Sequence, residues 1–135
     1  RSALTVAGVS GTHSTKIADS ATTSYNAGFL ESPAVVHDAA YTSVLADSGK
    51  TFIHTSASAH TWTIDSNANV AYPVGTIIAG KALNGSGNVT IAITSDTMRL
   101  AGSGTTGSRT MTANGSFVMQ KVATTEWQIS GTNLT

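Results

Sequence analysis

The chain has 135 residues, of which 40% are hydrophobic and 10% are charged, and its formal net charge is zero. This length fits one domain. Its few basic residues are scattered singly, which excludes the basic stripe needed to bind nucleic acid or an anionic membrane surface. No apolar run approaches the ~20 residues of a transmembrane helix. Cysteine is absent, so disulfides cannot stabilise the fold.

Hydroxyl side chains supply most of the polar surface, since the chain contains 22 Thr and 17 Ser. Thr is β-branched and fits a pleated strand better than a helix. The composition that keeps this weakly charged chain in water therefore also favours β-sheet. The start at Arg1 rather than Met is compatible with a chain that was processed or excised from a longer one.

Residues 1–35 are predicted to form an extended N-terminal arm. Small polar residues dominate this stretch, and its apolar residues are too thinly spaced to build a core. One short strand is expected at Leu4–Val9, where it could add to an exposed sheet edge of a neighbouring molecule. The residues expected to anchor the arm to a neighbour are Leu4, Val6, Val9 and Ile17.

Residues 36–135 show short apolar runs separated by turn residues, which is typical of a sandwich or barrel. Asp47–Gly49 and Asn84–Gly87 predict turns, and Leu100–Ser108 predicts an exposed glycine-rich loop. Asn114-Gly115 predicts a tight hairpin turn, because both residues tolerate positive φ. The expected strands are Tyr41–Leu45, Thr51–His54, Thr61–Ile64, Val74–Ala79, Val89–Ile93, Arg109–Met111, Phe117–Val122 and Glu126–Ser130. No clean internal repeat is visible.

These strands predict an all-β fold, specifically an antiparallel, jelly-roll-like β-sandwich over residues 36–135. Strict alternation within strands such as Thr61–Ile64 assigns their apolar side chains to one face. The predicted core consists of Trp62, Ile64, Val74, Ile77, Val89, Ile91, Ile93, Phe117, Met119, Trp127 and Ile129.

The histidines offer the first candidate chemistry, a zinc site. His54 and His60 lie six residues apart with Asp65 beyond, but zinc needs three or four converging ligands and no close histidine pair occurs. His13 and His37, in or near the arm, are better interpreted as surface or interface residues. We therefore expect no metal and no cofactor.

Enzymatic motifs are equally weak. The serines at Gly85–Gly87 and Gly102–Gly104 lack the strand-to-helix context of a nucleophile elbow. Gly104–Ser108 lacks the Gly-Lys-Ser/Thr ending and following helix of a phosphate-binding loop. The seven acidic residues lie mostly at turn positions and give no clear pair for glycoside hydrolysis. We therefore expect no catalytic residues.

A set of segments carries a family resemblance: Asn26–Pro33, Ala40–Lys50, Thr61–Ile64, Val70–Thr76, Val89–Ile93, Leu100–Arg109 and Trp127–Thr135. Together they resemble a C-terminal domain found in structural proteins of tailed bacteriophages, often tail fibres. The resemblance covers about residues 26–135 and implies a multimeric virion component without catalytic residues.

The expected function is therefore a non-enzymatic virion structural protein on the exterior of a phage particle. Three alternatives remain open: a fibre or appendage domain for assembly or host attachment, a capsid decoration (cement) protein, and an enzyme of the tail. The expected partners are further copies of the chain, with a homotrimer favoured, other capsid or tail proteins, and a host surface receptor. Neither nucleic acid nor membrane insertion is expected.

Overall fold

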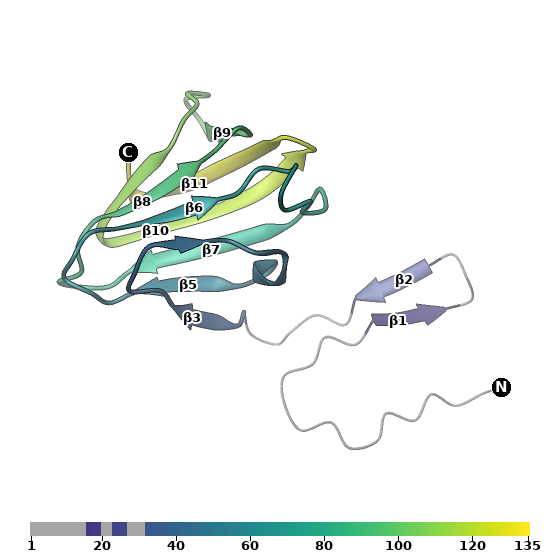
Figure 1. Cartoon of the computed structure of the whole chain (residues 1–135), viewed down its shortest axis with the longest axis horizontal. Coiled ribbons are helices and arrows are strands. Elements are labelled where there is room, and N and C mark those ends of the chain that lie inside the picture. Colours follow the sequence, from purple (N-terminus) through teal and green to yellow (C-terminus); the bar gives the residue numbers. More distant parts are fainter. Residues whose placement is uncertain (1–15, 20–22, 27–31) are drawn as a thin grey trace, which may run out of the picture. The chain divides into compact units, whose positions relative to one another are not determined.

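A computed structural model describes residues 16–19, 23–26 and 32–135 (Figure 1). The chain divides into two compact units, Arg1–Glu31 and Ser32–Thr135. Within the first unit, β1 (Lys16–Asp19) pairs antiparallel with β2 (Thr23–Asn26). The arm was expected to be extended, with a strand only at Leu4–Val9. That segment lies outside the described residues, and the β1–β2 pairing was not predicted.

The second unit, called the body below, is built on one nine-stranded sheet. It begins ahead of the expected boundary at residue 36, because β3 pairs with β5 and so belongs to the sheet. The strands of the body are β3 (Ala34–Val36), β4 (Tyr41–Thr42), β5 (Thr51–His54), β6 (His60–Ile64), β7 (Ile77–Ala82), β8 (Val89–Ile93), β9 (Thr97–Leu100), β10 (Arg109–Ala123) and β11 (Glu126–Leu134). A short 3₁₀ turn, η1 (Leu45–Asp47), follows β4.

Consecutive strands alternate between two halves of the sheet. In the odd half, β3, β5 and β7 pair in parallel, and in the even half β4, β6 and β8 do the same. Phe52 on β5 and Trp62 on β6 meet edge to face with ring centroids 5.5 Å apart. The two halves therefore face each other across a shared interior, and the chain winds from one to the other.

The long strand β10 joins the two halves (Figure 1). Its first residues, Arg109–Met111, pair antiparallel with β8, and Ser116–Gln120 pair antiparallel with β7. Its other edge pairs with β11, which in turn pairs in parallel with β9. The register shifts between Met111 and Ser116, so β10 carries an irregularity at the point where its partner changes.

The all-β prediction is confirmed, but the finer prediction is not. Antiparallel pairing is wrong for both halves and for β9 with β11, which are parallel. A jelly-roll-like sandwich is therefore not confirmed. The physical reason is the winding path: parallel neighbours need a crossover. Within the two halves each crossover runs through a strand of the opposite half, and between β9 and β11 it runs through β10.

The Asn114-Gly115 prediction is wrong in its topology. Both residues lie inside β10 instead of at a hairpin. Asn114 does adopt a positive φ of 61°, as the turn prediction required. This local conformation bends a continuous strand, and does not reverse the chain.

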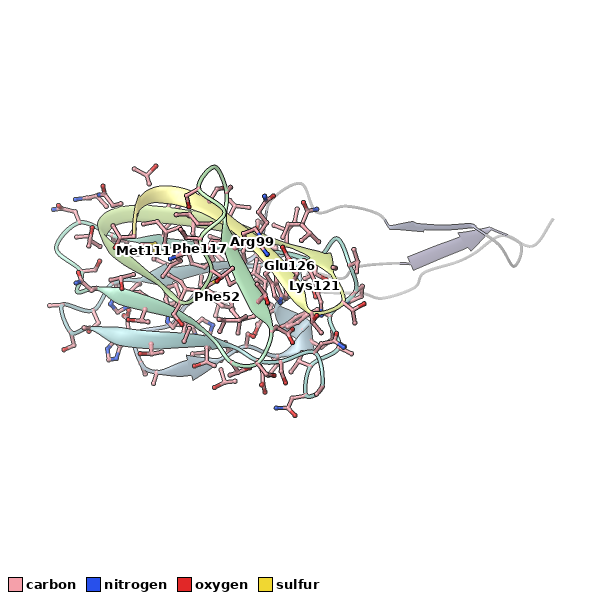
Figure 2. The ribbon with its side chains drawn as sticks, turned by 90° about the horizontal axis from the view of Figure 1, so that it is seen from above. Phe52, Arg99, Met111, Phe117, Lys121 and Glu126 are labelled. Carbon is pink, nitrogen blue, oxygen red and sulfur yellow. The ribbon has the colours of Figure 1, made fainter. Side chains whose placement is uncertain are left out.

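The interior is largely as predicted (Figure 2, with Phe52, Met111 and Phe117 labelled). The confirmed core residues are Trp62, Ile64, Val89, Ile91, Phe117, Met119, Trp127 and Ile129, and Ile93 packs against them. The assignment of Val74 and Ile77 to the core is wrong, because their side chains are 61% and 45% exposed. Core residues that were not predicted are Phe52, Tyr72, Ile78, Ala82, Met98 and Met111.

Ile77 is exposed because the residues of β7 that point inward are the ones that were expected to point outward. Ile78, Gly80 and Ala82 point inward, leaving Ile77 and Ala79 outside. Gly80 is paired with Phe117, and a Cβ at Gly80 would come within 2.3 Å of that ring. The interior at this point therefore needs a residue without a side chain, and this requirement fixes the phase of β7.

Candidate functional site

The outer surface of the odd half is the most distinctive exposed feature of the body. Paired residues of adjacent strands point to the same side of a sheet, so the register places aliphatic side chains side by side. We call this surface the aliphatic face and define it by Val36, Ile53, Ile77, Ala79 and Val118, on β3, β5, β7 and β10.

The aliphatic face exposes large side chains to solvent. Val36 is 58% exposed and Val118 is 49% exposed. Lys81 is the charged residue in the same rows, where it pairs with Ile53 and Ser116. Isolated surface aliphatics are ordinary, but adjacent ones on a nearly uncharged sheet surface are typical of a protein–protein contact.

The outer surface of the even half has a different chemistry. Thr42 pairs with Thr63, Thr61 pairs with Thr90, and Thr90 pairs with Thr110. We call these residues the threonine face. Their hydroxyls can bind water, so this face needs no partner to be stable in solvent. The two outer surfaces therefore differ in polarity: one is largely aliphatic, and the other carries rows of hydroxyl groups.

A groove of about 520 Å³ lies beside β9. Its lining residues are Ile93, Thr94, Asp96, Thr97, Met98, Arg99, Thr106, Gly107 and Ser108. Arg99 Nε donates to Glu126 Oε1 at 2.8 Å, and this contact raises the pKa of Arg99. Arg99 also donates to the Gly104 carbonyl at 3.0 Å, which fixes the glycine-rich loop predicted at Leu100–Ser108. None of the lining residues is aromatic, so the groove lacks a stacking surface for a sugar ring.

The histidine candidates form a packed structural cluster around β5. His54 is fully buried, with its Nδ1 3.3 Å from the His37 carbonyl oxygen and its Nε2 3.1 Å from the Ser58 carbonyl oxygen. The His60 ring is adjacent, at a centroid distance of 5.4 Å. Both ring nitrogens of His54 thus lie within hydrogen-bonding distance of main-chain oxygens, and these contacts give this histidine a structural role.

Asp65, the third candidate zinc ligand, forms hydrogen bonds with residues of the loop that follows it. Its Oδ1 accepts from the Ser66 amide at 2.7 Å and from Asn69 Nδ2 at 3.0 Å. In residues 16–19, 23–26 and 32–135, no three His, Asp or Glu side chains gather closely enough to hold a metal ion.

Asp38 anchors the same region from outside. Its carboxylate accepts hydrogen bonds from the Thr55 amide at 2.7 Å, the Ser56 amide at 2.9 Å and the Thr55 hydroxyl. These bonds, chiefly those from Thr55, lower the pKa of Asp38 to about 2. Close by, His37 stacks on Tyr41 at a centroid distance of 3.7 Å, and its burial lowers its pKa.

The predicted arm anchors are not brought together with any of these features. Leu4, Val6 and Val9 lie outside the described residues. Ile17 lies on β1, where its backbone is paired with Tyr25 of β2. The anchoring role of these residues therefore stays a prediction.

The sequence contains a signal for the aliphatic face that does not enter the predictions above. Phe117, Val118 and Met119 are consecutive apolar residues, followed by Val122, in a strand that otherwise alternates. A strand that is apolar on both sides is typical of one that is covered on both sides. The interior covers one side of β10, and the other side is the aliphatic face.

In the part of the chain that the structure describes, no helix is long and apolar enough to cross a membrane. Comparison of the chain with protein-family models, with curated proteins and with solved structures gives no match.

Proposed function

We propose that the protein is a non-enzymatic structural protein on the exterior of a bacteriophage particle, which assembles with further copies of itself through the aliphatic face. The observation that carries the assembly role is this face, where Val36, Ile77 and Val118 are exposed. Val36 pairs with Ile53 on the neighbouring strand, and Val118 pairs with Ala79. The virion setting rests on the resemblance to tailed-phage structural proteins.

The charge distribution supports self-association. A zero net charge removes the long-range repulsion that keeps copies of a protein apart. Aliphatic side chains brought together release water at roughly 25 cal/mol per Å² of buried apolar area. A homotrimer remains the favoured oligomer. The threonine face and the groove beside β9 stay exposed in such an assembly and are the surfaces available to a host receptor or to other virion proteins.

The test is to place a charge on the aliphatic face at Val118, which is exposed and pairs with Ala79. Val118→Lys should convert the oligomer to monomer at micromolar concentration, because the ammonium would be buried without a partner in the contact. Size-exclusion chromatography with multi-angle light scattering measures the mass of the species in solution. The matched control is Thr63→Lys on the threonine face, which should leave the oligomer unchanged.

Two results would count against the proposal. One is a wild-type protein that is already monomeric at micromolar concentration. The other is a Val118→Lys protein that keeps the wild-type mass, since the contact would then lie elsewhere. Circular dichroism on both variants establishes that the body is folded, so loss of the oligomer cannot be confused with unfolding.

A capsid decoration protein is the second candidate, and the same contact surface supports it. A compact body with an N-terminal arm suits attachment to a capsid lattice as well as it suits the end of a fibre. The two roles differ in stoichiometry. A few copies per purified particle indicate a fibre or appendage, and hundreds indicate decoration, so quantitative mass spectrometry of particles separates them.

A further inference from the structure

Lys121 occupies a position in β10 where an apolar residue is expected. The strand alternates, and Phe117 and Met119 fill the preceding inward positions. Lys121 takes the next one and is only 1% exposed. Its main chain is paired with Thr76 and Gly75 at 2.9 and 2.7 Å, so the side chain cannot turn outward without breaking the strand.

The buried amine has few partners. Its Nζ donates to Asn67 Oδ1 at 2.7 Å and lies 5.6 Å from the centre of the Trp127 ring. Among the described residues, no carboxylate forms an ion pair with it. A buried ammonium without a counter-ion costs several kcal/mol, so this arrangement is poorly explained as a stabilising contact alone.

Asn67 is held in place for this contact by an acid. Its main-chain amide donates to Asp96 Oδ2 at 3.0 Å, and Asp96 is itself 8% exposed. The following turn is closed by the Asn69 and Val70 amides, which donate to the Ser66 carbonyl. The Asn67 side chain is therefore directed at Lys121 from a fixed loop, with a buried carboxylate at its base.

We propose that Lys121 and Asn67 form an intramolecular isopeptide bond, with Asp96 as the residue that positions Asn67. The 2.7 Å hydrogen bond leaves Nζ no more than about 3.9 Å from the Asn67 Cγ, given a carbonyl bond of about 1.2 Å. Two reacting groups held at this range by a rigid fold react as if at very high concentration.

The reaction needs no co-reactant. The ammonium of Lys121 gives a proton along its hydrogen bond to Oδ1 of Asn67, and the free amine attacks Cγ of Asn67. A proton then passes from the attacking nitrogen to the departing amide nitrogen. The old C–N bond breaks, ammonia leaves and takes the proton back from the oxygen, and a neutral amide joins the two side chains. The net change is loss of one ammonium ion.

Formation of the bond removes the buried, unpaired charge of Lys121. A neutral secondary amide replaces an unpaired buried cation, and diffusion of ammonia makes the step irreversible. The bond would tie the loop after β6, in the even half, to the end of β10 that pairs with the odd half. It would therefore cross-link the two halves covalently in a chain that has no disulfide.

Intact-mass spectrometry of the purified full chain tests this directly. The expected mass is lower than the sequence mass by one ammonia. After trypsin, Lys121 should resist cleavage, and peptide 51–81, which contains Asn67, should appear joined to peptide 110–135. The location matters because Asn114-Gly115 could also lose ammonia by cyclising, but that product contains no cross-link.

Matched variants identify the reacting groups. Lys121→Arg keeps the positive charge but cannot be acylated in this way, so its mass should equal its full sequence mass. Asn67→Asp carries a carboxyl group and should reach the wild-type cross-linked mass by losing water instead. Asp96→Ala removes the oxygen that accepts from the Asn67 amide and should slow bond formation, whereas Asp96→Asn keeps such an oxygen and should slow it less.

A wild-type chain at full sequence mass, with free peptides 51–81 and 110–121 after prolonged incubation, would overturn the proposal. This readout is made on the wild-type protein, so it does not depend on any variant folding. It is also independent of oligomer state, so it can fail while the proposed assembly role stands.

Discussion

Asp38 shows how a single exposed side chain can make the stability of the body depend on pH. Its pKa falls from an ordinary 3.8 to about 2 because Thr55 and Ser56 donate to the carboxylate. The folded protein therefore holds fewer protons than the unfolded chain between these values. The stabilisation is complete above pH 3.8 and is lost as the pH falls to about 2.

Replacement of Asp38 with Asn should remove this pH dependence. The difference in free energy of unfolding between wild type and Asp38→Asn should be constant near neutrality and should shrink as the pH falls from about 4 to about 2. Urea denaturation followed by tryptophan fluorescence at a series of pH values measures both proteins. A difference that does not change over this range would mean that the hydrogen bonds to Thr55 and Ser56 do not depend on the charge.

At the same scale, the sequence predicts side-chain direction well only where alternation is strict. Thr61–Ile64 and Val89–Ile93 alternate, and their inward residues were assigned correctly. Val74–Ala79 is largely apolar and does not alternate, so its sequence did not show which residues point inward. The choice depends on Gly80 meeting Phe117, a contact between strands distant in sequence.

The Lys121–Asn67 contact also could not be predicted from the sequence, because it joins segments that are distant in sequence. The two residues lie 54 positions apart, and a lysine near the end of a predicted strand is ordinarily a solvent-exposed residue. The available signal was its phase, because Phe117, Met119 and Lys121 share one side of the strand. That signal is convincing only once β10 is known to continue past Lys121 with its inner side covered.

The element that organises the body is β10, and Asn114 is the residue that lets it bend. Left-handed backbone costs an ordinary residue roughly 1–2 kcal/mol, and Gly or Asn much less. Asn114→Val should therefore lower the free energy of unfolding by about 1–2 kcal/mol, whereas Asn114→Gly should leave it nearly unchanged. Thermal and chemical denaturation of the two variants measures this.

Equal effects of the two substitutions would mean that the positive φ at Asn114 is not what limits the side chain there. The contact of Asn114 Nδ2 with Asn84 Oδ1, at 3.3 Å, would then be the more important contribution. Both variants lose that contact, so the comparison between Val and Gly isolates the backbone term.

Parallel pairing could not be predicted from these strands. Short strands joined by turn residues are compatible with hairpins, and nothing local distinguishes a chain that reverses from one that winds on. The winding path also repeats at unequal sequence intervals, so no period is visible in the sequence. Equivalent positions on β3 and β5, Ala34 and Thr51, are closer in sequence than Thr51 and Ala79 on β5 and β7. Turns of unequal length leave no fixed period.

At the scale of the whole molecule, the two outer surfaces have opposite requirements. The threonine face can remain in water, whereas the aliphatic face gains free energy when it is covered. Composition indicated a molecule that associates, since charge is scarce and apolar content is ordinary. It could not indicate where, because the aliphatic face is assembled from β3, β5, β7 and β10 only by the register of the sheet.

The arm is expected to add a second attachment to such an assembly. Leu4, Val6, Val9 and Ile17 are its available apolar anchors, and an isolated strand gains order only when its amides find partners. The body forms its own compact unit from Ser32 onward. Deletion of residues 1–20 should therefore leave the thermal stability of the body nearly unchanged while it weakens incorporation into particles.

Incorporation can be measured by competition between tagged full-length and truncated chains during particle assembly, with the copy number of each counted by mass spectrometry. A control with Leu4, Val6 and Val9 replaced by Ser keeps the length of the arm and removes only its apolar anchors. If the arm acts by these anchors, this control should be as deficient as the truncation. Equal incorporation of all three chains would mean that attachment depends on the body alone, through the aliphatic face.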